Sequence, residues 1–156
     1  MHEEVMNKPF QRIGSKSNAD VGREFESAAS KFFINKGIKL TPNVKIAVGV
    51  ANLKKEHAFD LGCIEQQIIV ECKAHKWTAG GNVPSAKLTV WNEAMYYFFT
   101  APTGFRKIMF VLHDFSAKRN ETLAEYYIRT YKHLIPNDVE LWEYDENTKR
   151  ASQLCI

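Results

Sequence analysis

Residues 57–73 read His57-Ala-Phe-Asp-Leu-Gly-Cys-Ile-Glu-Gln-Gln-Ile-Ile-Val-Glu-Cys-Lys73, a pattern typical of buried strands that is interrupted by charged residues. Ten residues separate Asp60 from Glu71, and Lys73 follows two positions later. Isolated charges are costly to bury, so these three side chains are expected to pair with one another or with a metal ion. The stretch is therefore a candidate functional site.

Strand geometry predicts how the three charges meet. Side chains alternate along a strand, so Glu71 and Lys73 are expected to share one face while Cys72 points the opposite way into the core. A turn at residues 65–66 would make a hairpin with Asp60 and Glu71 side by side on its two strands. Two adjacent carboxylates form part of an oxygen shell suited to Mg²⁺, and a nearby ammonium can hold or deprotonate a water.

Apolar periodicity along the chain predicts the element order αβββαβαβ. The expected helices are 20–36, 87–99 and 120–135, and the expected strands are 44–50, 58–63, 67–72, 107–113 and 139–144. Strand-helix-strand connections of this length favour parallel pairing with a right-handed crossover. The predicted fold class is therefore α/β, with a mixed central sheet flanked by helices.

The charged residues and the element order together resemble the PD-(D/E)xK superfamily, the restriction-endonuclease-like phosphodiesterases. The triplet over 71–73, Glu-Cys-Lys, matches the family's (D/E)xK element, and Asp60 matches its aspartate. Phe59 stands where the family's proline is usual. The resemblance implies a restriction-endonuclease-like αβββαβ core, here with an added C-terminal αβ.

The first predicted helix carries one more candidate acid. At about 100° per residue, Glu26 falls on one flank of the apolar face and Glu24 on the other. The segment 22–26, Gly-Arg-Glu-Phe-Glu, is similar to the Gly-x-x-Phe-Glu opening of the Mrr-like and Holliday-junction-resolvase-like branches of the superfamily. Glu26 is therefore preferred over Glu24, and the alternative for either is a solvated helix carboxylate.

The resemblance also implies roles for the matched residues. Asp60, Glu71 and the backbone carbonyl of Cys72 would bind Mg²⁺, for which Mn²⁺ can substitute, and Glu26 would complete the shell directly, through water or on a second ion. Lys73 would orient or help deprotonate the attacking water. The implied activity is metal-dependent hydrolysis of DNA phosphodiester bonds, restriction-like or resolvase-like, leaving a 5′-phosphate.

Four residues near the triplet are candidate nucleic-acid contacts. His75 would share the strand face of the triplet's charges, with Lys76 and Trp77 at the mouth of the site and Lys87 beyond a glycine-containing loop. Together they would hold phosphates and stack on a base. The alternative is a structural lysine stem lying beside a partly buried ring.

Two other interpretations remain open. An ion pair between Asp60 and Lys73 could simply bridge two strands, although Glu71 would then lie uncompensated beside Asp60. A zinc site drawn from Cys63, Cys72 and nearby histidines is disfavoured because the chain has no Cys-x-x-Cys spacing. A different class of function is a non-catalytic nucleic-acid-binding or assembly protein that keeps the nuclease fold.

Composition sets the remaining expectations. A chain of 156 residues is expected to form one domain over 18–156, preceded by a flexible arm over 1–17. Three cysteines, an odd number, suggest reduced thiols in a cytoplasmic protein, and no apolar run is long enough to make a membrane a partner. The net charge of +3 is compatible with DNA as the partner. Duplex cutting would need a homodimer, and specificity would come from loops or from a partner protein.

Overall fold

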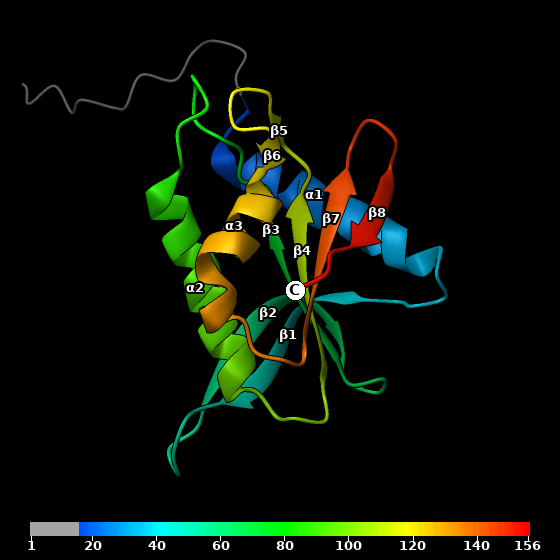
Figure 1. Cartoon of the computed structure of the whole chain (residues 1–156). Helices are drawn as coiled ribbons and strands as arrows, with labels where there is room; N and C mark the ends of the chain where they lie inside the picture. The colour runs from blue at the N-terminus through cyan, green and yellow to red at the C-terminus, as the bar shows by residue number, and fades with distance from the viewer. Residues whose placement is uncertain (1–15) are drawn as a thin grey trace, which may run out of the picture.

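Helices and strands alternate along residues 16–156, the part of the chain that the computed structural model describes (Figure 1). Their order is α1 (Asn18–Ile34), β1 (Thr41–Val48), β2 (Lys55–Cys63), β3 (Ile68–Lys73), α2 (Ser85–Thr100), β4 (Arg106–Leu112), β5 (Phe115–Ser116), β6 (Glu121–Thr122), α3 (Leu123–Tyr131), the short 3-10 helix η1 (Lys132–Leu134), β7 (Val139–Asp145) and β8 (Arg150–Gln153). Among these residues, no helix is both long and apolar enough to cross a membrane.

Six strands form one mixed sheet in the order β1-β2-β3-β4-β7-β8. The β1-β2, β2-β3 and β7-β8 pairs are antiparallel, whereas β3-β4 and β4-β7 are parallel. The C-terminal ends of β3, β4 and β7 therefore lie side by side at the same end of the strands, which is toward the top of Figure 1. The predicted α/β class and the mixed central sheet are confirmed.

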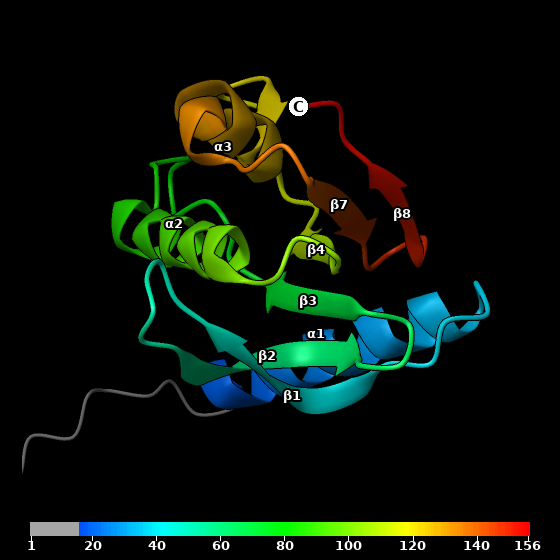
Figure 2. The same ribbon diagram turned by 90° about the horizontal axis from the view of Figure 1, so that it is seen from below.

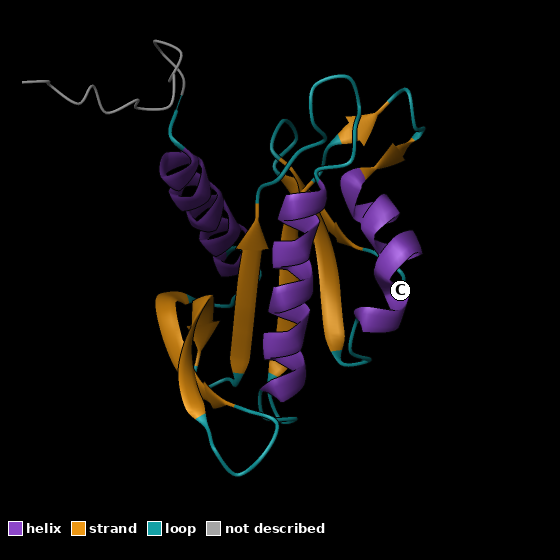
Figure 3. Ribbon diagram, turned by 90° about the vertical axis from the view of Figure 1, so that its left-hand side faces the viewer, coloured by secondary structure: helices purple, strands orange, loops and turns teal. Residues whose placement is uncertain are grey.

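The helices cover both faces of the sheet. Helix α1 packs on one face and α2 and α3 pack on the other, as Figure 2 shows. Figure 3 shows α2 running along the strands of the sheet. Because both faces are covered, residues 107–112 of the central strand β4 are all buried, as expected for a strand in the middle of a two-sided core.

Helix α1 shows why the predicted elements form. Ser17 caps its first turn by accepting a hydrogen bond from the backbone N–H of Asp20, and Phe25, Ala29 and Phe33 bury one face at four-residue spacing. Gly37 follows in the left-handed region at φ 78°, a conformation that ends helices at low cost for glycine. The helix begins and ends two residues before the predicted bounds.

The C-terminal half departs from the prediction in two places. The helix predicted over 120–135 is shorter and begins only at Leu123, because Asn120 adopts φ 52°. Thr122 pairs with Phe115 in the β5-β6 hairpin. Its side chain also caps α3 by accepting a hydrogen bond from the backbone N–H of Glu125. A further strand, β8, pairs with β7 although its side chains are mostly exposed. Neither the two-residue strands nor an exposed edge strand carries an apolar period that would reveal it.

The predicted arm over 1–17 lies almost wholly outside the described residues. Its last two residues are described: Lys16 forms an ion pair with Glu24 at 2.8 Å, and Ser17 caps α1. That the rest of the chain folds as a single domain stays a prediction.

Candidate functional site

A cavity of ≈ 320 Å³ opens at the C-terminal end of β3, between the first turns of α1 and α2. We call it the β3 cavity. Six of the predicted site residues line it: Glu26, Asp60, Cys72, Lys73, His75 and Lys87. Glu71 lies beside it, with only 4% of its surface exposed. The side chains predicted to be catalytic thus lie close together, although they come from three elements, α1, β2 and β3.

Asp60 reaches this place because of the register between β2 and β3. Strands β2 and β3 run antiparallel, and Leu61 pairs with Val70. Asp60, which precedes Leu61, therefore lies next to the end of β3. Asp60 accepts a hydrogen bond from the backbone N–H of Cys72 over 2.8 Å. Burial and then the negative charge of Glu71 raise the pKa of Asp60 to about 7. Two mutually repelling carboxylates are therefore held together here.

Glu71 is surrounded by nitrogen atoms that keep it ionised. Its Oε1 lies 3.0 Å from Nε2 of His57, and its Oε2 lies 3.5 Å from Nζ of Lys73. Although burial acts in the opposite direction, the hydrogen bond from His57 and the charge of Lys73 hold the pKa of Glu71 below its ordinary value. Asp60 and Glu71 thus have pKa values that are pushed apart, an arrangement common at functional sites.

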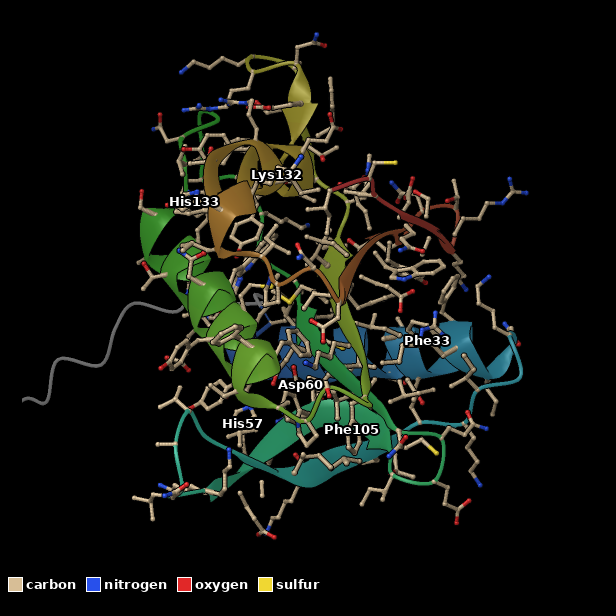
Figure 4. The ribbon with its side chains drawn as sticks, turned by 60° about the horizontal axis from the view of Figure 1, so that its bottom comes forward. Phe33, His57, Asp60, Phe105, Lys132 and His133 are labelled. Atoms are coloured by element: carbon tan, nitrogen blue, oxygen red, sulfur yellow. The ribbon has the colours of Figure 1, made fainter. Side chains whose placement is uncertain are left out.

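His57, one of the nearby histidines of the disfavoured zinc site, was not predicted to contact Glu71. Its ring stacks on Tyr97 of α2, with centroids 3.6 Å apart, and meets the ring of Phe59 edge-on. Figure 4 shows His57 and Asp60 along the same strand, beneath α2. The predicted strand began at residue 58, whereas β2 begins at Lys55, so His57 is a strand residue rather than a loop residue.

Glu26 lines the β3 cavity from α1, whereas Glu24 lies outside it and pairs with Lys16. Burial and the charge of Glu71 raise the pKa of Glu26 above its ordinary value, partly offset by Lys73. The structure therefore places Glu26, and not Glu24, within electrostatic reach of the β2-β3 carboxylates.

His75 and Lys87 also line the cavity, from the loop after β3 and the first turn of α2. The indole N–H of Trp91 donates a hydrogen bond to Nδ1 of His75 over 2.7 Å. Burial, followed by the positive charges of Lys73 and Lys87, lowers the pKa of His75 to about 4. At neutral pH the imidazole is therefore uncharged.

The other two candidate contacts, Lys76 and Trp77, do not line this cavity. Lys76 is exposed and lies 3.9 Å from a carboxylate oxygen of Glu146. Trp77 is anchored by Asp114, which accepts its backbone N–H at 2.8 Å and its indole N–H at 3.0 Å, and the guanidinium of Arg119 lies 5.0 Å from its ring centroid. Strand β3 ends at Lys73, so the strand alternation does not continue to these residues.

Asp60 and Glu71 are the residues of this site that could hold a hard divalent cation. Within residues 16–156, no three Asp, Glu, His or Cys side chains already gather as a metal-binding group. Two close carboxylates, one with its pKa raised to about 7 by burial and by the other's charge, would be relieved by a bound cation with oxygen preference. The thiol of Cys72 instead packs with the core on the α1 side, and burial raises its pKa, so it does not offer a thiolate.

Comparisons with known proteins add one finding about the fold. No family model matches the chain, and no curated protein matches it. A solved chain from the CdiA-CT/CdiI toxin and immunity complex of Burkholderia pseudomallei is similar, with a TM-score of 0.50 and 16% identity over 96% of each chain. At this identity the likeness shows a shared fold alone.

Proposed function

We propose that the chain is a Mg²⁺-dependent endonuclease that hydrolyses phosphodiester bonds in DNA, with the site arrangement of the PD-(D/E)xK superfamily. The observation that carries the proposal is that Asp60 and Lys73 line one cavity, while the buried Glu71 lies beside it with its Oε2 3.5 Å from Nζ of Lys73. A purely structural ion pair between Asp60 and Lys73 would not explain this arrangement, because Lys73 bonds to Glu71 instead. A close ion pair would also lower the pKa of Asp60, whereas that pKa is raised to about 7.

Each side chain has a role in this proposal. Asp60, anchored by the N–H of Cys72, and Glu71, held by His57, are the ligands for the metal, and Glu26 supports them from α1. When bound, Mg²⁺ lowers the pKa of a coordinated water and offsets charge on the phosphoryl oxygens. Lys73 orients the attacking water and stabilises negative charge that develops in the transition state.

The fold supports the same proposal. The order α1, β1, β2, β3, α2, β4, with an antiparallel β1-β2-β3 meander and a parallel β3-β4 pair, agrees with the αβββαβ core that the resemblance implies. The active-site charges lie at the carboxyl end of β3, where loops and helix starts leave room for a substrate. The β5-β6 hairpin and β8 are additions to that core.

The direct test is a cleavage assay. The chain is incubated with supercoiled, linear, single-stranded and four-way-junction DNA, each with Mg²⁺, Mn²⁺ or EDTA. Cleavage with either metal that disappears in EDTA and in Asp60→Asn supports the proposal. Absence of cleavage from every lane, or undiminished cleavage by Asp60→Asn, contradicts it. The exposed residue Lys45 of β1 provides the control variant Lys45→Met, which should cleave as the wild type does.

A second candidate is a binding protein that keeps this fold without cleaving. The structural neighbour, which belongs to a toxin and immunity complex, favours a protein partner for this chain as well. DNA binding without cleavage under every metal condition would favour this candidate. Light scattering on the free chain tests the homodimer that duplex cutting would require.

A further inference from the structure

The β3 cavity carries two kinds of polar side chain. The carboxyl groups of Asp60 and Glu26 come from β2 and α1, whereas Lys73, His75 and Lys87 come from the end of β3, the loop after it and the first turn of α2. A phosphodiester is an anion that needs hydrogen-bond donors and positive charge and is repelled by carboxylates. The nitrogen-bearing side chains are therefore where a substrate phosphate belongs.

Trp91 determines which nitrogen of His75 carries the proton. Trp91 is fully buried on α2, and its indole N–H can only donate. Because it donates to Nδ1 of His75 over 2.7 Å, that nitrogen must be unprotonated. The proton of the neutral imidazole then sits on Nε2.

The Nε2 atom remains available to a ligand. His75 forms no other side-chain hydrogen bond within residues 16–156, and Nε2 is not one of the buried atoms there that lack a partner. It is therefore accessible, on a residue that lines the cavity. A protonated Nε2 can donate to a phosphate oxygen, but it cannot ligate a metal or accept a proton.

The surroundings keep this donor neutral. The charges of Lys73 and Lys87 both disfavour a third positive charge, and burial acts in the same direction. The carboxyl groups of Asp60 and Glu26 line the same cavity, but the pKa of His75 is nevertheless lowered to about 4. Two ammonium groups thus supply the charge and the imidazole supplies a directed N–H.

We propose that His75 is a substrate-binding residue whose Nε2–H, oriented by the indole of Trp91, donates a hydrogen bond to a non-bridging oxygen of the substrate phosphodiester beside Lys87. This inference rests on the proposed function, since it names the group that holds the phosphate at the same site. It also separates His75 from the metal ligands and from any role as general base, because neither of its nitrogens has a free lone pair for the cavity.

The first test reads the tautomer in the wild-type protein. Nitrogen NMR of the histidine rings in metal-free protein at neutral pH should show His75 as the Nε2–H tautomer with an unprotonated Nδ1. A neutral Nδ1–H tautomer or an imidazolium would overturn the inference. This measurement needs neither a variant nor catalytic activity.

The second test measures binding of a short fluorescein-labelled oligothymidylate by anisotropy in EDTA. Since hydrogen bonds to charged groups are the stronger ones, His75→Phe should weaken binding about tenfold. His75→Gln, which keeps an N–H donor, should stay within about threefold of the wild type. The matched control is His133→Phe, at an exposed histidine of η1 (Figure 4), which should bind as the wild type does.

The outcomes distinguish this inference from the proposed function. If the wild type cleaves DNA but His75→Phe binds as tightly as the wild type, the inference fails and the function stands. If His75→Gln loses as much affinity as His75→Phe, the donor role fails. If the wild type never cleaves but His75→Phe still weakens binding, the phosphate contact stands and the nuclease proposal fails. Thermal melting of each variant verifies that it is folded.

Discussion

The Nε2 atom of His57 lies 3.0 Å from Oε1 of Glu71, so a histidine on β2 holds the carboxylate of β3 on the side away from Lys73. Glu71 is nearly fully buried, and a buried carboxylate that loses a hydrogen-bond partner is costly. The ring of His57 is itself held by Tyr97 of α2. The position of the predicted metal ligand therefore depends on a residue outside the triplet.

His57→Ala is expected to destabilise the fold by about 1–3 kcal/mol, because Glu71 keeps its charge but loses its partner. Urea unfolding measures this cost. The same substitution in a Glu71→Gln background should cost clearly less, since the buried charge is gone. Equal costs in the two backgrounds would mean that His57 acts through packing on Tyr97 and not through Glu71.

Asp60→Asn is expected to abolish cleavage while stabilising the protein by about 1–2 kcal/mol above pH ~7. Burial and Glu71 raise the pKa of Asp60 from 3.8 to about 7, so the folded state binds a proton that the unfolded state has released. The stability of the wild type relative to Asp60→Asn should therefore fall as pH rises from ~4 to ~7 and level off above that. Melting curves across this range test the sign, and a difference that grows in favour of the wild type would contradict it.

Lys73→Met is expected to reduce cleavage by about 10²–10⁴-fold, because it removes the ammonium while keeping the apolar stem. Single-turnover rates at saturating Mg²⁺ measure the loss. DNA binding in EDTA should change much less than the rate does. A variant that cleaves at the wild-type rate would remove Lys73 from the chemistry.

A second histidine-glutamate pair predicts a separate pH effect. His113 Nδ1 lies 2.9 Å from Oε1 of Glu143, and this hydrogen bond raises the pKa of His113 above its ordinary 6.5. The stabilisation is fully present below pH ~6.5 and is lost as pH rises through the raised pKa. The wild type should therefore melt at a higher temperature than His113→Gln at low pH, and this difference should disappear as pH rises through the raised pKa of His113. A difference that is unchanged or larger at high pH would contradict the assignment.

Strong apolar periodicity made most of the fold predictable. The apolar residues of α1 and β4 predicted the bounds of both elements to within two residues. Side chains that pack in a core must be apolar, so their spacing is visible in the sequence. The β5-β6 hairpin and β8 have no such spacing. Their strands are very short or lie exposed at the sheet edge, and their pairing depends on partners distant in the chain.

The candidate site was predictable only where charge interrupts an apolar pattern. Asp60, Glu71 and Lys73 stand out in this way, and the resemblance of residues 22–26 to a Gly-x-x-Phe-Glu opening favoured Glu26 over Glu24. The partners that orient the site could not be read, because His57 reaches Glu71 across strands and Trp91 reaches His75 from α2. Both residues resemble ordinary core side chains in the sequence.

Every role proposed for this site requires that Asp60 and Glu71 together bind a divalent cation, which titration calorimetry with Mn²⁺ and Mg²⁺ can measure. We expect saturable binding to the wild type that is lost in both Asp60→Asn and Glu71→Gln but retained in Lys45→Met. No uptake of either ion by the wild type, or uptake that survives the loss of both carboxylates, would contradict this requirement.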